Sequence, residues 1–178
     1  MRIITPSDFT TTRWKNGGGI THEIARADCD GFLLWRLSLA EVSSDGPFST
    51  FKGLARILTV VEGPGMNLHG PDAIRHARPD APLAFSGGLP VHGELFDGPV
   101  KNLNLLYDPV RIKASVTCVT RPIKLAPKSD LTALYVTAGS VSFNETAVSK
   151  GHVALFHSDE LDLPANCAAL NCTLQDRG

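Results

Sequence analysis

Apolar and polar residues alternate along many short segments of the chain, with the two-residue period of a strand that buries one face. In the clearest of these segments, the residues on one face are Trp35, Leu37 and Leu39. The residues on the other face are Arg36 and Ser38. Twelve prolines and sixteen glycines interrupt the sequence, so few segments are long enough for an amphipathic helix. The pattern therefore predicts an all-β protein of the sandwich or barrel type.

The order of the short apolar segments repeats along the chain. The three matched pairs, in chain order, are Leu58–Gly63 with Leu134–Gly139, Leu83–Phe85 with Val153–Phe156, and Leu103–Leu105 with Leu170–Cys172. The first half carries a longer insert, Leu68–Pro82, which is rich in histidine, proline and aspartate. Because the three matches occur in the same order, they favour two copies of one structural unit.

A strand, a glycine turn and two further apolar strands form a pattern similar to that of cupins, which have an RmlC-like jelly roll. The segment Gly151–Ala165 resembles the second cupin half-motif. The sequence therefore predicts a bicupin with two β-barrels in one compact chain. Residues 1–108 would form the first barrel and carry the pocket, and residues 109–178 would form the second, mainly as scaffold. The boundary is placed at the strand-breaking step Asp108-Pro109.

Composition excludes several classes of function. The 178 residues are 43% hydrophobic and 20% charged, which is typical of a globular domain rather than a disordered or membrane-spanning chain. The net charge is −1 and no run of lysine or arginine occurs, so we expect no nucleic-acid partner. No segment has the length of a membrane span or the apolar core of a signal peptide. We expect a cytoplasmic protein with four reduced cysteines and no membrane contact. A homodimer is one possible oligomeric state.

The segment Trp14–Ile24 combines an aromatic ring, a lysine, an amide, three glycines, a hydroxyl and a carboxylate. One interpretation is a tight turn that leads into a strand. The other is one wall of a small-molecule pocket, because Gly17–Gly19 would let backbone amides approach an anion with no side chain in between.

A second polar segment, Ser43–Gly53, precedes the first copy of the repeat, and the second half lacks its polar residues. An Asp-Gly-Pro turn within it is ordinary loop chemistry, so a hairpin loop is one interpretation. Yet Phe48 and Phe51 offer apolar walls, and Ser49 offers a hydroxyl. With Arg56 they suit a ligand that bears a carboxylate, because a guanidinium matches a carboxylate with two parallel hydrogen bonds.

Five ordered motifs make the chain similar to the HutD/Ves family: Trp14–Ile24, Trp35–Val42, Asp45–Phe51, Arg56–Gly63 and Asp97–Asn104. They cover essentially the whole chain. The resemblance implies a bicupin-like fold. The HutD branch accompanies histidine-degradation enzymes and is thought to temper that pathway, whereas the Ves branch is associated with cold and environmental stress. The resemblance implies no established reaction.

Two positions depart from the family pattern. Ala55 stands where the family usually has an acidic residue, just before Arg56. After Asn104 the chain continues with Leu105–Asp108 instead of a methionine and a basic segment. Both departures favour a Ves-like or divergent member over a strict histidine-pathway protein.

The histidines do not form the His-x-His pattern through which many cupins bind a metal. His22 and Glu23 are adjacent, so on a strand they would point to opposite faces. We therefore expect no metal and no other cofactor. The chain also lacks a nucleophile elbow and a cysteine with a basic neighbour, so no catalytic residue is assigned.

Three roles stay open for Glu23: an ion pair with Arg36 or Arg56, a carboxylate that orients a ligand, and a catalytic base. An arginine partner normally lowers the pKa of a carboxyl group, which disfavours the role of base at neutral pH.

The sequence thus predicts a pocket on the first barrel that binds a small carboxylate metabolite. Its candidate residues are Asn16, Gly17, Thr21, Glu23, Arg36, Ser38, Phe48, Ser49, Arg56 and Asn104. A competing interpretation is that Arg36 and Glu23 simply pair on an exterior sheet face, because barrel interiors are usually apolar.

Two functions of different kinds fit these residues. The first is a non-enzymatic binding protein that modulates histidine or amino-acid catabolism or a stress response. It is favoured because the pocket has no evident acid–base pair. The alternative is a metal-independent cupin enzyme, an isomerase or hydrolase that acts on a small acidic metabolite.

Overall fold

The computed structural model describes residues 1–125, 129–143, 146–157 and 160–177. Within these ranges, the regular structure consists of strands and one short 3₁₀ helix, η1 (Pro6–Asp8), which confirms the all-β prediction. The chain divides into two compact units. The first-half unit is Thr10–Pro109, and the second-half unit combines Met1–Phe9 with Val110–Gly178.

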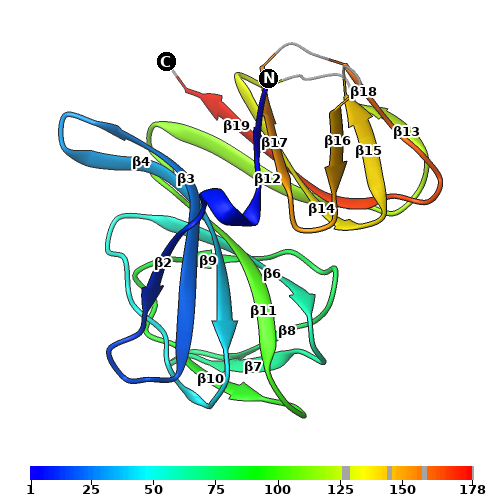
Figure 1. The fold of residues 1–178 in the computed structure, drawn as a ribbon. Coiled ribbons are helices and arrows are strands. Elements are labelled where there is room, and N and C mark those ends of the chain that lie inside the picture. Colours follow the sequence, from blue (N-terminus) through cyan, green and yellow to red (C-terminus); the bar gives the residue numbers. More distant parts are fainter. Residues whose placement is uncertain (126–128, 144–145, 158–159, 178) are drawn as a thin grey trace. The chain divides into compact units, whose positions relative to one another are not determined.

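The first-half unit contains two antiparallel sheets (Figure 1). The six-stranded sheet has the order β2 (Thr10–Arg13), β3 (Gly19–Cys29), β4 (Phe32–Val42), β11 (Val100–Tyr107), β6 (Ala55–Glu62) and β9 (Leu83–Ser86). The four-stranded sheet has the order β5 (Gly46–Pro47), β10 (His92–Leu95), β7 (Met66–His69) and β8 (Ile74–Ala77). One apolar core draws Leu58 and Val60 from the larger sheet and Met66 and Leu68 from the smaller, so the two sheets face each other.

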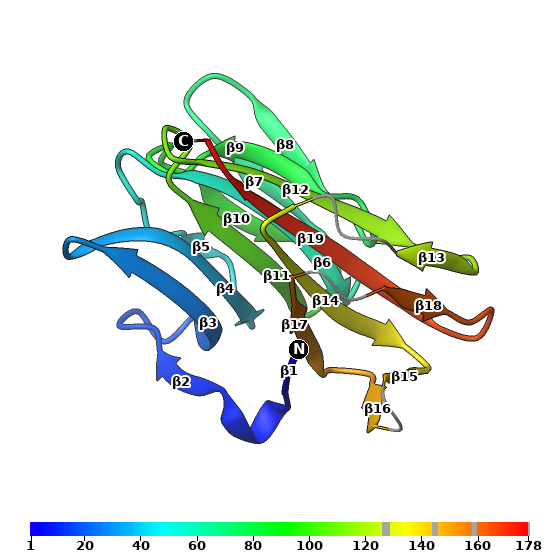
Figure 2. The ribbon, with the colours of Figure 1, turned by 90° about the horizontal axis from the view of Figure 1, so that it is seen from above.

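The second-half unit has one five-stranded sheet and two ribbons. The sheet has the order β1 (Arg2–Ile4), β17 (Val153–Phe156), β14 (Leu131–Ala138), β19 (Ala168–Asp176) and β12 (Ile112–Val119), and Figure 2 shows β19 between β12 and β14. The ribbons pair β13 (Ile123–Leu125) with β18 (Leu161–Leu163), and β15 (Ser140–Phe143) with β16 (Thr146–Ser149). Residues 158 and 159 of the expected cupin half-motif lie outside the described residues.

The repeat seen in the sequence is present in the strand pairing. β6 lies between β11 and β9 in the first-half unit, and β14 lies between β19 and β17 in the second-half unit. β6 and β14 each contain five consecutive buried residues. The segment expected to be an insert contains β8, which forms a hairpin with β7 just as β16 does with β15. Only part of Leu68–Pro82 is therefore an insert relative to the second-half unit.

Residues 1–9 do not join the unit to which the sequence assigned them. β1 pairs antiparallel with β17 and buries Ile4, which is 1% exposed. A three-residue strand carries too little pattern to indicate which sheet edge it will cover. The strands described here also form separate sheets, with no closed barrel. In the first-half unit, one isolated bridge, Val60 with Pro79, pairs outside the named strands.

The sequence expectations for the cysteines and for membrane spans can be compared with the described residues. Within the described residues none of the four cysteines forms a disulfide, and Cys167 and Cys172 are buried. Burial raises the pKa of the Cys172 thiol to about 12, so this group remains a neutral thiol at physiological pH. The described part of the chain contains no helix whose length and hydropathy would let it span a bilayer.

Gly63 should be needed for the turn that follows β6. Its φ is +93°, and a Cβ at this position would overlap the carbonyl oxygen of Pro99. Gly31 has a similar φ of +80°, but open space surrounds it. We expect Gly63→Ala to lower the free energy of unfolding by about 3 kcal/mol or more, and Gly31→Ala by about 1–2 kcal/mol, the cost of the left-handed backbone alone. Urea denaturation of both variants measures the difference, and equal losses would contradict it.

Candidate functional site

The register of the six-stranded sheet brings two arginines to one face. β11 lies between β4 and β6, and Leu106 of β11 pairs with Arg36 on one side and with Arg56 on the other. Side chains in one cross-strand row point to the same face of a sheet. The next pair along places Asn104 beside Ser38 on that face. Four polar candidates from three strands thus gather around one point.

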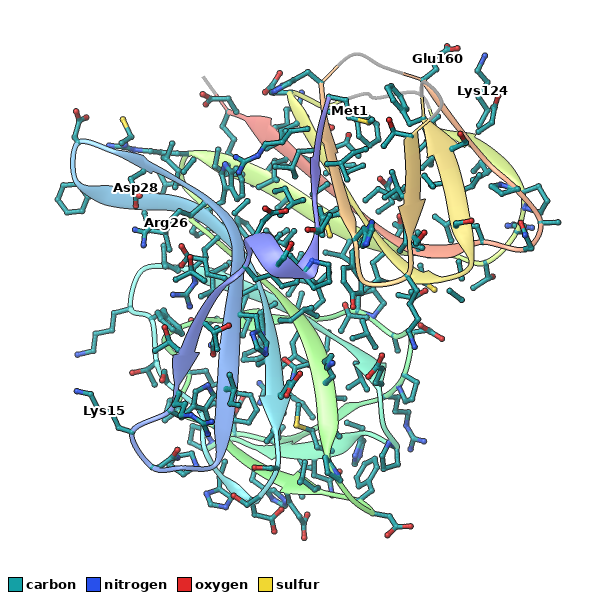
Figure 3. All side chains as sticks on the ribbon, viewed as in Figure 1. Met1, Lys15, Arg26, Asp28, Lys124 and Glu160 are labelled. Atoms are coloured by element: carbon teal, nitrogen blue, oxygen red, sulfur yellow. The ribbon has the colours of Figure 1, made fainter. Side chains whose placement is uncertain are left out.

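These residues line a small cavity, here called the inner cavity, of about 50 Å³. It is lined by Trp14, Thr21, Arg36, Ser38, Ala40, Phe48, Ser49, Phe51, Arg56, Asn104 and Leu106. A larger outer cavity of about 610 Å³ is lined by Thr10, Thr12, Arg13, Trp14, Lys15, Asn16, Thr21, Glu23, Arg36, Pro47, Phe48, Ser49 and Phe51. Six residues line both, so the cavities adjoin. Figure 3 shows Lys15 on the loop between β2 and β3.

Arg56 is a buried cation without a carboxylate. Its residue is 6% exposed, and its Nη2 donates a hydrogen bond of 3.4 Å to the carbonyl oxygen of Ser49. Its Nε is buried and has no hydrogen-bond partner. Among the described residues, no carboxylate forms an ion pair with it. Burial, and next the positive charge of Arg36, lower the pKa of Arg56 to about 10.

Arg36 is half-buried and has one distant carboxylate. Glu23 Oε2 lies 4.0 Å from Arg36 Nη1 and 3.9 Å from Arg26 Nη1. The Nε of Arg36 is also buried without a partner. Burial lowers the pKa of Arg36 despite the nearby charge of Glu23. The loose pair lines the outer cavity, so the competing interpretation, a pair on an exterior face, does not describe its position.

Aromatic rings surround both guanidinium groups. The Cζ of Arg36 lies 5.1 Å from the centroid of the Phe51 ring, and that of Arg56 lies 5.2 Å from it. Arg56 also lies 5.9 Å from the ring of Phe48 and 5.7 Å from that of Phe85. The negative face of an aromatic ring attracts a cation within about 6 Å. These contacts stabilise the buried charge of Arg56 in part, since no carboxylate among the described residues pairs with it.

Trp14 forms the wall where the two cavities meet. Its Nε1 donates a hydrogen bond of 2.8 Å to the hydroxyl of Thr21. Its ring meets that of Phe48 edge to face, with centroids 5.6 Å apart. A Cβ at Gly19 would lie 3.1 Å from the indole and would overlap the carbonyl oxygen of Glu41. Gly19 therefore leaves the space that the indole occupies.

The glycine-rich loop is a tight turn and a pocket wall at once. It joins β2 to β3, and Trp14, Lys15 and Asn16 line the outer cavity. The amide of Gly17 donates to the carbonyl of Trp14, and the amide of Gly18 to Asn16 Oδ1. Both amides are thus used within the turn. Gly17 does not line either cavity, so the expectation that these amides face an anion is not met.

Nine of the ten candidate residues line the cavities, all except Gly17. Cavity residues outside that set include Thr10, Thr12, Arg13, Trp14, Lys15, Pro47 and Phe51. Trp14, Lys15 and Phe51 belong to motifs that the sequence analysis had already singled out. The residues from β2 were missed because a four-residue edge strand, exposed along its length, gives no burial signal.

The described residues contain no group of three or more histidine, cysteine, aspartate or glutamate side chains placed to hold a metal ion. His69 Nε2 lies 2.8 Å from Glu94 Oε2, and His22 Nδ1 lies 2.8 Å from the Thr11 hydroxyl.

Known proteins are similar to this chain over most of its length. The family model of HutD matches residues 6–178. The chain belongs to the HutD family. An uncharacterised 21.2 kDa protein in the hutC 3′ region of Pseudomonas putida is 31% identical over 185 residues, which cover 99% of this chain and 94% of that protein. Protein Ves of Cronobacter sakazakii is 31% identical over 147 residues, 82% of this chain and 81% of that protein.

Solved structures similar to this chain include a HutD protein and a protein that shares only the fold. The structure of HutD from Pseudomonas fluorescens SBW25 superposes with a TM-score of 0.89 at 29% identity and covers 99% of both chains. A nickel-bound bacterial pirin from Escherichia coli superposes with a TM-score of 0.69 at 9% identity, over 98% of each chain. The second likeness is one of fold alone, and it supports a cupin-like architecture for this HutD family member.

The unpaired charge of Arg56 should cost stability when the cavity is empty. Because its folded pKa lies below the ordinary value of 12.5, the charged form is disfavoured in the fold at every pH below about 10, and the penalty is relieved only as pH rises above that. We expect Arg56→Met to raise the free energy of unfolding at pH 7 by about 1–3 kcal/mol. Arg75→Met is the matched control, because Arg75 has its own carboxylate, Asp72, at 2.8 Å. Denaturation that shows Arg56→Met to be less stable would contradict this account.

Proposed function

We propose that this HutD family member binds a small carboxylate in the first-half unit. One observation carries the proposal: two guanidinium groups, Arg36 and Arg56, converge on one cavity, and both keep a buried Nε without a partner. Burying a charge without an opposite charge is expensive, so natural proteins rarely keep one unless it serves a purpose. A carboxylate would accept hydrogen bonds from both groups.

The two cavities differ in size, so each suits a different part of the ligand. The inner cavity of about 50 Å³ is much the smaller, and it suits a carboxylate together with the atoms next to it. The outer cavity of about 610 Å³ accommodates the rest of the metabolite against Trp14 and Phe48. Lys15 and Arg13 at its wall add positive charge that attracts an anion.

The family suggests the biological setting. Binding without chemistry suits a protein that modulates histidine or amino-acid catabolism, and the P. putida relative in the hutC 3′ region supports that setting. The match to protein Ves supports a role in a stress response as the other setting. We further infer that the two units are two cupin modules of a bicupin, since they share one strand order, and that the second serves mainly as scaffold.

An enzyme is the second candidate, because Glu23 lines the same outer cavity as Arg36. Such an enzyme would be an isomerase or hydrolase of a small acidic metabolite. Incubation of the protein with a metabolite extract, followed by mass spectrometry, distinguishes the two. Consumption of one carboxylate would support the enzyme, provided that Glu23→Gln abolishes it, and binding without turnover would support the binding protein.

Carboxylate binding should depend on both arginines. In thermal-shift and calorimetric titrations with acetate, propionate and intermediates of histidine degradation, we expect the wild type to be stabilised, by about 2.7 kcal/mol at 100 times the dissociation constant. Arg36→Gln and Arg56→Met should lose this stabilisation. Arg75→Gln should keep it, because Arg75 lines neither cavity and is paired with Asp72. Binding that persists in Arg56→Met would assign the anchor elsewhere.

The affinity should also follow the charge of Arg56. Because its pKa is lowered to about 10, the guanidinium is charged at neutral pH and loses its proton earlier than an ordinary arginine as pH rises. We expect a constant affinity for a carboxylate up to about pH 9 and a fall approaching tenfold per pH unit above about pH 10. Calorimetric titrations across this range measure it, with circular dichroism at each pH as the control for folding. An affinity that does not change up to pH 11 would contradict the role of Arg56.

A further inference from the structure

Two buried asparagines on β11 fix the direction of a hydrogen-bond acceptor in the inner cavity. Asn102 Nδ2 donates to the carbonyl oxygen of Ala40 at 3.4 Å, and a carbonyl can only accept. The Oδ1 of Asn102 must therefore face the other way, where it accepts a hydrogen bond of 2.6 Å from Asn104 Nδ2. The backbone of β4 thus sets the orientation of both amides.

This relay points the carbonyl oxygen of Asn104 toward the cavity. Asn104 is 6% exposed and lines the inner cavity together with both arginines. Its Oδ1 is buried and has no hydrogen-bond partner. The cavity therefore presents guanidinium donors and one fixed acceptor. A simple carboxylate has acceptors alone, so it satisfies the arginines and leaves Asn104 Oδ1 unpaired, which costs binding free energy.

We propose, building on the carboxylate-binding function above, that the inner cavity selects 2-hydroxycarboxylates. The carboxylate of the ligand accepts from Arg36 and Arg56, and its 2-hydroxyl donates to Asn104 Oδ1. The hydroxyl is adjacent to the carboxylate, so both groups enter the same small cavity. A 2-ammonium group would also donate, but two neighbouring guanidinium charges repel it. The site therefore distinguishes hydroxy acids from both plain acids and amino acids.

A second arrangement of the same atoms predicts the opposite result. Asn104 Oδ1 and Arg56 Nε both lack partners and both residues line the inner cavity, so in the alternative arrangement the two atoms pair with each other. The acceptor would then be consumed inside the protein, and a 2-hydroxyl would bring no gain. Selectivity between matched acids separates the two arrangements.

The experiment compares acids that differ by the hydroxyl alone: glycolate with acetate, and lactate with propionate. Calorimetric titration of the full chain at pH 7 should show the hydroxy acid of each pair binding about tenfold more tightly, the scale of one buried acceptor gained or left unpaired. Glycine should bind more weakly than glycolate. Equal affinities within both pairs would overturn the selectivity and leave the carboxylate site standing, whereas no binding of any acid would overturn the site itself.

Substitution of the relay provides an independent measurement. Asn104→Leu has a similar volume and no acceptor, so the ratio of its affinities for glycolate and acetate should fall from about ten to about one. Asn102→Leu frees the amide of Asn104 to rotate and present its Nδ2 to the anion, so acetate should bind more tightly than in the wild type and the preference should again disappear. A preference for glycolate that survives in Asn104→Leu would assign the selectivity to another residue. The wild-type comparison decides the proposal even if neither variant folds.

Discussion

The structure of the pocket depends on one electrostatic constraint, which is the burial of two like charges side by side. Arg36 and Arg56 share a cavity, and each stacks about 5 Å from the same ring of Phe51. The charge of Arg36 adds to burial in lowering the pKa of Arg56, and phenylalanine rings rather than carboxylates surround Arg56. The fold has therefore placed a positive potential inside a small cavity with aromatic walls. Under the proposed function, an anion that enters would relieve this strain, so binding and stability would be linked at this point.

Strand order explains why this constraint could be anticipated only in part. The alternation around Trp35 already placed Arg36 and Ser38 on one face, because a period of two needs only local sequence. That Leu106 would stand between the two arginines depends on β11 pairing with both β4 and β6, which are closer to each other in the sequence than either is to β11. The internal repeat indicated two copies of one structural unit. It did not indicate the register of the strands, which sets the position of each side chain.

Other features could not be derived from local pattern at all. The amide orientations of Asn102 and Asn104 depend on a carbonyl of a neighbouring strand, so the sequence showed only a polar residue between leucines. The amides of Gly17 and Gly18 were expected to face a ligand, but the turn itself uses them, since a tight turn satisfies its own donors first. The strands were predicted to close into barrels, whereas closure depends on pairings between edge strands that lie far apart in the chain.

The pairing of β1 with β17 sets an order of events during synthesis. β1 is synthesised before the strands that follow it, yet its partner β17 (Val153–Phe156) comes after every strand of the first-half unit. Thr10–Pro109 holds both sheets of that unit, so all its strands are available before β17 is synthesised. The N-terminal segment must wait, unpaired, while roughly 150 residues follow it. A contact of such long range forms late, because its loop-closure entropy is lost before any pairing repays it. β1 is thus among the last strands to pair.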